Sequence, residues 1–148
     1  MTEHFLSATN PWWVIPKHLA GSCKPAAADL VIFRKKGISA IVSLLSDDSN
    51  LDLYQQNSIP HIWVPVLGGN APNLGQLNQI QTFVNTQNQL GNAVVIHCSS
   101  GRRRTGTVLT ALLVQQGQSY ESALNIVLTI NPNIELREPQ INFLKSLS

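Results

Sequence analysis

VVIHCSSGRRRTG, residues 94–106, is the stretch from which the fold and the function of this chain are best inferred. An apolar, β-branched run stops at a cysteine, and an arginine follows after five intervening residues. This order predicts a buried strand, a tight loop and the N-terminus of a helix. Backbone N–H groups converge in such a loop and the helix dipole adds positive potential, so the sequence predicts an anion-binding loop.

Two side chains of this stretch carry the chemistry. Cys98 is the first residue of the predicted loop. A thiol in that electrostatic field ionises more readily, so we expect a thiolate facing a bound phosphate at neutral pH. Arg104 closes the loop, and its planar guanidinium can bind two phosphate oxygens at once.

Composition narrows the class of protein. The 148 residues fit one domain with a substantial core, and only 12% are charged, against about 25% in a typical globular protein. A net charge of +2 is too small to predict a general nucleic-acid surface. Cys23 and Cys98 are the only cysteines, which excludes a disulfide framework and suits a reducing cytosol. No stretch resembles a signal peptide or a membrane span.

The order of the predicted elements indicates an α/β fold. Apolar periodicity and turn signals predict strands over 12–15, 19–22, 38–45, 61–64 and 93–97, and helices over 25–36, 51–56, 74–90, 105–116 and 119–131, with a last helix from 138 or 139. In the first helix, Ala26, Leu30, Val31 and Phe33 are predicted to face the core. We expect a single domain with a mostly parallel central sheet, helices on both faces, and the site at a strand's C-terminal end.

The stretch His97-Cys98-x5-Arg104-Thr105-Gly106 resembles the signature of the protein tyrosine phosphatase superfamily. Residues 13–21, WVIPKHLAG, resemble the W-x-x-P-x-x-L-A-G strand pair of small atypical dual-specificity phosphatases. Pro65 and the Ala-Pro at 71–72 resemble the frame of their general-acid loop, and residues 133–135, NIE, resemble a segment bordering the active site. The resemblance implies one dual-specificity-phosphatase-like domain of the phosphatase fold over residues 1–148.

The resemblance also implies a mechanism and a role for each matching residue. Cys98 would attack phosphorus and form a cysteinyl-phosphate that water then hydrolyses. Thr105 would hydrogen-bond the sulfur, and His97 would fix the loop and tune the thiolate. The equatorial phosphate oxygens would be held by the loop, whose residues are Ser99, Ser100, Gly101, Arg102, Arg103 and Arg104. This mechanism needs no metal or cofactor, and we expect neither.

The family's general acid has no counterpart here. It is an Asp either directly after the loop proline or about three residues on, where this chain has Val66 and Gly68; no acid lies between Asp52 and Glu121. Losing such an acid costs about 10²–10⁴ in rate. Three interpretations stay open: Asp47 or Asp48 replaces it, leaving groups are limited to aryl or polyphosphate, or the domain binds phosphate groups and turns over slowly.

Other residues leave two interpretations each. Arg102 and Arg103 either extend selectivity toward multiply anionic substrates or point to water. Glu135 either positions the hydrolytic water or starts a helix. Cys23 is expected to be a small core residue rather than a disulfide partner of Cys98.

We therefore predict a cytoplasmic, monomeric, cysteine-dependent phosphomonoesterase. Its partner would be a phosphorylated protein carrying phosphotyrosine, with phosphoserine or phosphothreonine as further substrates. One alternative is a phosphatase for phosphoinositide or RNA 5′-phosphate, which the additional arginines favour. The other is a phosphate-binding adaptor of low or no activity, which the missing acid favours.

Overall fold

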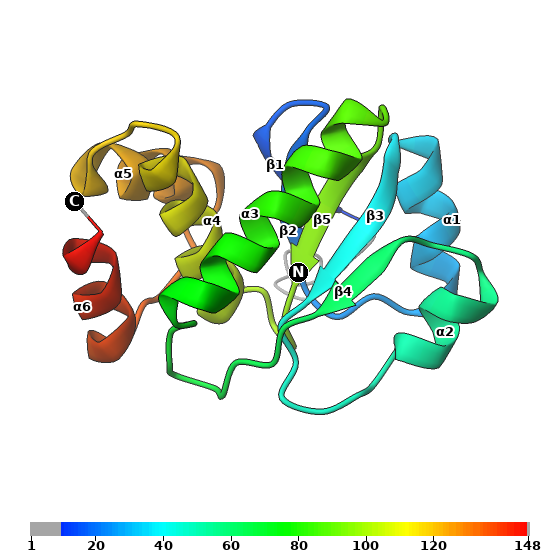
Figure 1. Cartoon of the computed structure of the whole chain (residues 1–148), viewed down its shortest axis with the longest axis horizontal. Coiled ribbons are helices and arrows are strands. Elements are labelled where there is room, and N and C mark those ends of the chain that lie inside the picture. Colours follow the sequence, from blue (N-terminus) through cyan, green and yellow to red (C-terminus); the bar gives the residue numbers. More distant parts are fainter. Residues whose placement is uncertain (1–9, 148) are drawn as a thin grey trace.

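A five-stranded sheet runs through the computed structural model, which describes residues 10–147 (Figure 1). Residues 1–9 and 148 of the predicted domain lie outside the described residues. The strands are β1 Trp12–Ile15, β2 Leu19–Ser22, β3 Ile38–Ser43, β4 His61–Trp63 and β5 Ala93–His97. Their order across the sheet is β1-β2-β5-β3-β4. The β1–β2 pair is antiparallel and the other pairs are parallel, so the sheet is mostly parallel as predicted.

The central strand β5 is buried along its whole length. It pairs in parallel with β2 on one side and with β3 on the other. Val94 and Ile96 belong to the core on one face of the sheet, and Val95 belongs to the core on the other face. A strand buried on both faces has a continuous apolar sequence, which is why this run is so recognisable. Because β5 ends at His97, the next residue, Cys98, lies at the C-terminal edge of the sheet.

Helices cover both faces of the sheet (Figure 1). The helices are α1 Ala27–Lys35, α2 Leu51–Gln56, α3 Leu74–Gln89, α4 Arg104–Gln115, α5 Tyr120–Ile130 and α6 Glu138–Ser146. The first two supply Leu30, Phe33 and Tyr54 to the smaller core, and the other four pack on the opposite face around the larger one. This arrangement confirms the predicted α/β fold. None of the helices in the described part combines the length and the apolar character needed to cross a bilayer.

Two predictions for this first helix are wrong. Leu30 and Phe33 are buried as expected, but Val31 is 59% exposed. Ala26, which precedes α1 as its N-cap, is also exposed. Residues three apart share a helix face, whereas adjacent residues are separated by about 100° around the axis. Leu30 and Phe33 therefore define the face that packs on the sheet, and Val31 lies off it.

Candidate active site

The loop from β5 to α4 holds the Cys98 sulfur between two donors. Cys98 is 2% exposed. Its Sγ accepts hydrogen bonds from the Gly101 backbone N–H, at 3.2 Å, and from the Thr105 Oγ1 hydroxyl, at 3.1 Å. Donors aimed at the sulfur stabilise negative charge both on an attacking thiolate and on a thiolate that leaves. Thr105 thus makes the contact that was expected of it.

Two glycines allow this loop to fold tightly against its neighbours. Gly101 has a φ of +75°, and a Cβ there would lie 2.8 Å from the Ser22 carbonyl oxygen of β2. A Cβ on Gly106, in the first turn of α4, would lie 2.8 Å from Ile134. Only a residue without a side chain meets both demands at Gly101. At Gly106 the close contact brings the segment after α5 against the loop.

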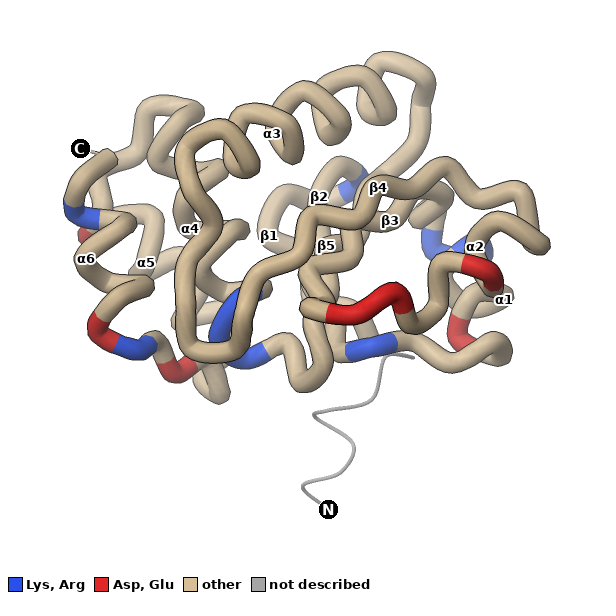
Figure 2. The backbone as a smooth tube through the Cα atoms, turned by 60° about the horizontal axis from the view of Figure 1, so that its bottom comes forward, with Lys and Arg blue, Asp and Glu red and all other residues tan. Residues whose placement is uncertain are grey.

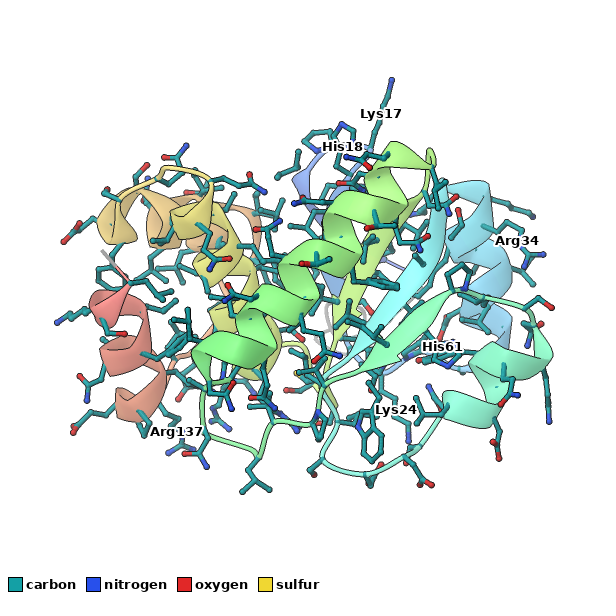
Figure 3. All side chains as sticks on the ribbon, viewed as in Figure 1. Lys17, His18, Lys24, Arg34, His61 and Arg137 are labelled. Carbon is teal, nitrogen blue, oxygen red and sulfur yellow. The ribbon has the colours of Figure 1, made fainter. Side chains whose placement is uncertain are left out.

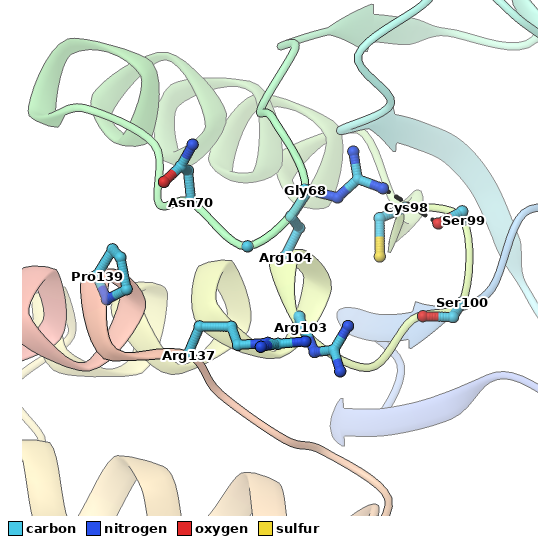
Figure 4. A pocket seen from close by; sticks show the side chains of 10 residues that line it. Gly68, Asn70, Cys98, Ser99, Ser100, Arg103, Arg104, Arg137 and Pro139 are labelled. Carbon is cyan, nitrogen blue, oxygen red and sulfur yellow. Dashed lines mark hydrogen bonds between the residues drawn. The ribbon is translucent and has the colours of Figure 1, made fainter.

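Arg104 ties three segments together. It is 9% exposed and is the first residue of α4. Its Nη1 donates to the carbonyl oxygens of Val66, at 2.8 Å, and Leu44, at 3.4 Å. Its Nη2 donates to Ser99 Oγ at 3.1 Å (Figure 4). A guanidinium has five N–H donors, so donors remain for phosphate oxygens. The group is therefore held in place before any ligand binds.

His97 supports the loop from below through a chain of hydrogen bonds. Its Nδ1 lies 3.1 Å from the Cys98 carbonyl oxygen, and its Nε2 lies 2.8 Å from the Tyr54 hydroxyl. The carbonyl can only accept, so Nδ1 carries the proton and Nε2 accepts from Tyr54, whose oxygen accepts from Asn50 Nδ2 at 3.0 Å. Burial lowers the pKa of His97 to about 4, so the ring is neutral at physiological pH. The ring thus contacts the Cys98 backbone, and the roles of fixing the loop and tuning the thiolate stay predictions.

Tyr54 and Asn50 are site-supporting residues that sequence reasoning missed. Both lie at α2, far along the chain from the loop, and belong to no motif. Burial raises the pKa of Tyr54 to about 12, so it stays a neutral donor. The only signal in the sequence is that Asn50 and Tyr54 are four residues apart, a spacing at which side chains can meet on one side of a helix.

A cavity of about 530 Å³ opens over Cys98 (Figure 4). It is lined by Gly68, Gly69, Asn70, Cys98, Ser99, Ser100, Arg103, Arg104, Arg137 and Pro139. Of the predicted phosphate-binding residues, Gly101 and Arg102 are the two that are not in this lining. Arg137 was not predicted, since it lies far from the loop in sequence and no motif marks it. Among the described residues, no carboxylate lines the cavity.

The loop expected to carry the general acid contributes backbone instead. Val66 is 4% exposed, and its carbonyl oxygen accepts from Arg104. Gly68 lines the cavity, and the space where its Cβ would lie is open. Neither position of the expected acid therefore presents a proton donor.

Asp47 and Asp48 lie in an exposed loop after β3, at the same edge of the molecule as the arginine-bearing loop (Figure 2). Asp47 Oδ1 accepts from the Ser49 N–H at 3.0 Å. The hydrogen bonds from Ser49 lower the pKa of Asp47, and Lys24 and Arg104 add to the effect. Neither acid lines the cavity, and an ionised Asp47 holds no proton to donate. A role for either as general acid stays a prediction.

Glu135 bridges two of the loop arginines. Its carboxylate lies 3.0 Å from Arg102 Nη2 and 3.8 Å from Arg103 Nη2. Its backbone N–H donates to the Arg102 carbonyl at 3.1 Å. Glu135 lies outside α6, which begins at Glu138, so it does not start that helix. Arg102 is paired outside the cavity, whereas Arg103 lines it.

Cys23 lies near the loop but is not joined to Cys98 by a disulfide. It packs against the smaller core, as expected, and burial raises the pKa of its thiol. The next residue, Lys24, donates its backbone N–H to the Ser99 carbonyl at 3.0 Å. In residues 10–147, no group of three or more His, Cys, Asp or Glu side chains is placed to hold a metal ion.

A family model described as Tc-R-P, polymorphic toxin system, DSP-PTPase phosphatase, matches residues 17–118. The chain belongs to this family. The match contains β5, Cys98 and Arg104, and so it covers the loop that borders the cavity described above.

Curated relatives are also phosphatases. The tyrosine-protein phosphatase yvh1 of Schizosaccharomyces pombe is 28% identical over 97% of this chain and 42% of its own length. Phosphatidylglycerophosphate phosphatase PTPMT2 of Arabidopsis thaliana is 24% identical over 93% of this chain and 63% of its own length. The DSP-PTPase chain thus spans less than two thirds of the length of these relatives.

Solved structures agree on the fold. The crystal structure of Tk-PTP in the active form matches with a TM-score of 0.84 and 28% identity, over 93% of this chain and 95% of that chain. The crystal structure of PTPMT1 matches with a TM-score of 0.82 over 93% of each chain. Because the two sequences are only 19% identical, this similarity shows the fold alone.

Proposed function

We propose that this DSP-PTPase chain hydrolyses phosphate monoesters through a cysteinyl-phosphate. One observation carries the proposal: the Cys98 sulfur lies at a cavity between the Gly101 N–H and the Thr105 hydroxyl, beside the fixed guanidinium of Arg104. Phosphoryl transfer requires a nucleophile, hydrogen-bond donors for the developing negative charge and a fixed cation, and this site has all three.

The two steps use these residues in turn. Cys98 Sγ, as thiolate, forms a bond to phosphorus while the ester P–O bond breaks and its electron pair leaves on the departing oxygen. Arg104 and the loop N–H groups hold the nonbridging oxygens. Water then attacks phosphorus and passes a proton to a phosphate oxygen, the S–P bond breaks, and inorganic phosphate leaves. The electron pair returns to sulfur, where Thr105 stabilises the charge.

The absence of a lining carboxylate sets the preference among leaving groups. Without a proton donor, the departing oxygen leaves as an anion, and a phenol with a pKa of about 10 does so far more easily than an alkyl alcohol. We therefore propose phosphotyrosine over phosphoserine or phosphothreonine as the preferred protein substrate. Similarity to a tyrosine-protein phosphatase supports this class, and a thiol nucleophile suits the cytoplasm.

A second candidate function is a phosphate-binding module that turns over slowly. The observation that favours it is the same lining, which holds arginines and, among the described residues, no acid. Phosphate would then be held by Arg104 and the loop amides without efficient release of the leaving group.

Hydrolysis of para-nitrophenyl phosphate by wild type, Cys98→Ser and Cys23→Ser separates the two candidates. We expect wild type and Cys23→Ser to show a burst and a trappable phosphoenzyme, and Cys98→Ser to lose at least about 10⁴ in rate. Cys23 is the matched control because it is the chain's other cysteine. If wild type binds vanadate but shows no turnover that depends on Cys98, the module is a binder and the hydrolase proposal is wrong.

A further inference from the structure

The cavity over Cys98 also contains two arginines that the mechanism above does not use. Arg103 precedes α4 and Arg137 precedes α6, so the two arrive from separate elements. Both line the same cavity as Cys98, and the Arg137 side chain points toward that of Arg103 (Figure 4).

The positive charge of this pair is poorly compensated. Within residues 10–147, the Arg137 guanidinium has no hydrogen bond or ion pair, and Arg103 Nε is buried without an acceptor. The Glu135 carboxylate lies 3.8 Å from Arg103 Nη2 but 3.0 Å from Arg102 Nη2, so it compensates the charge of Arg102 more than that of Arg103. Cations that face a concave surface without a counter-charge attract an anionic ligand.

Arg137 lies beside the loop of residues 65–72 that borders the cavity. A Cβ on Gly69 would lie 3.9 Å from Arg137 Cγ, so Arg137 stands beside the loop that should carry the general acid. The cavity of about 530 Å³ falls in the range of small-molecule sites, about 300–1,000 Å³. There is room beside Cys98 for the part of a substrate that lies beyond the phosphate under attack.

We propose that Arg103 and Arg137 form a second anion subsite, which binds a phosphate group in the leaving portion of the substrate. Guanidinium groups that reach the cavity from two directions suit the several oxygens of a phosphate better than a single carboxylate. The leaving portion then departs with its charge held by arginines, which reduces the need for a proton donor. The role in turnover rests on the proposed hydrolase function; the binding does not.

Calorimetric titration tests the binding without turnover, using Cys98→Ser and the probes inorganic phosphate and inorganic tripolyphosphate. We expect tripolyphosphate to bind at least about tenfold more tightly than phosphate. In the Cys98→Ser background, Arg137→Ala should reduce the affinity for tripolyphosphate at least about fivefold more than the affinity for phosphate. Arg137→Lys should reduce the affinity for tripolyphosphate less than Arg137→Ala does. The matched control is Arg34→Ala, an exposed arginine on α1, which covers the opposite face of the sheet (Figure 3).

Two results would overturn the subsite. In one, Arg137→Ala weakens tripolyphosphate no more than Arg34→Ala does, which leaves only a general charge effect. In the other, Arg137→Ala weakens a phosphotyrosine peptide with acidic flanking residues more than it weakens tripolyphosphate, which makes the pair a contact for protein carboxylates. Neither depends on hydrolysis, so failure of the hydrolase proposal is seen separately in the para-nitrophenyl phosphate assay.

Discussion

The two loops that meet over the cavity differ in what they contribute. In the anion loop, residues 98–104, side chains and N–H groups converge on the Cys98 sulfur and on the space in front of it. The acid loop, residues 65–72, has the prolines that resemble the frame of a general-acid loop, but it presents no acid. The anion loop is equipped for binding and attack, and the acid loop is not equipped to protonate.

The acid loop still has a structural task. Its carbonyl oxygens accept from Gln76 Nε2 at 3.1 Å, from Arg104 Nη1 at 2.8 Å and from Gln140 Nε2 at 3.0 Å. Gln140 is fully buried. The loop is therefore fixed by α3, α4 and α6 together and keeps the Arg104 fork in place. A loop beside the cavity can therefore lack a proton donor and still be needed for the geometry of its neighbour.

Among the substitutions in these two loops, Arg104→Lys should lower the catalytic rate most. Lysine keeps a charge but cannot span Val66, Leu44 and Ser99 with a planar fork. We expect kcat for para-nitrophenyl phosphate to fall by about 10²–10³, as when one oxyanion donor is removed. Arg34→Lys is the control, and steady-state kinetics is the measurement. An Arg104→Lys enzyme within about tenfold of wild type would contradict the role given to the fork.

The buried, neutral His97 should make the stability of the fold depend on pH. Burial lowers the pKa of His97 to about 4, whereas an unfolded histidine has a pKa of about 6.5. Between these values the unfolded chain binds a proton that the folded chain does not, so stability falls as pH falls. From pH 7 to about pH 4 the loss should approach about 3 kcal/mol.

Urea unfolding at a series of pH values measures this loss. We expect His97→Asn to be less stable than wild type at neutral pH and to lack most of the dependence in that window. His18→Asn, which replaces an exposed histidine, should keep it. An unchanged slope in His97→Asn would assign the acid sensitivity to other groups.

An aspartate at position 68 tests whether the acid loop can protonate a leaving group. The space beside Gly68 is open, so Gly68→Asp can be accommodated without a clash. We expect it to raise kcat/KM for phenyl phosphate by about tenfold or more, and to raise that for para-nitrophenyl phosphate less, because nitrophenol leaves without help. Gly68→Asn has the same size and no proton to give. Equal behaviour of the Asp and Asn variants would show that the position cannot reach the leaving group.

Asp47→Asn and Asp48→Asn should have the smallest effects. Hydrogen bonds from Ser49 lower the pKa of Asp47, and neither side chain lines the cavity. We expect less than about threefold change in kcat/KM for phenyl phosphate, since exposed charges are well screened. A selective loss with phenyl phosphate, and none with para-nitrophenyl phosphate, would instead identify the substituted residue as the missing acid.

The sequence allowed the anion loop to be predicted because its parts are local. Cys98, Thr105 and Arg104 lie in one short stretch between a buried strand and a helix, and their contacts follow from that order. Asp47 and Asp48 follow β3, which runs parallel to β5, so their loop lies at the same edge of the sheet as Cys98. The directions of the two side chains depend on local turns and could not be predicted.

Other parts of the site could not be predicted because they depend on tertiary packing. Tyr54 and Arg137 reach the site from α2 and from the start of α6, and neither stands in a motif. The Val66 carbonyl that holds Arg104 is a backbone group, so the residue type carries no trace of it. Val31 shows the same limit in the core, since an apolar residue on a short helix does not reveal which face packs.

A series of leaving groups is the most direct test of whether this cysteine phosphatase works without a carboxylic general acid. The measurement is kcat/KM for a set of substituted aryl phosphates at one pH, for wild type and Gly68→Asp. We expect kcat/KM to fall steeply in wild type as the pKa of the leaving phenol rises, and less steeply in Gly68→Asp. A shallow dependence in wild type would contradict the absence of a general acid, because the site would then be supplying the proton.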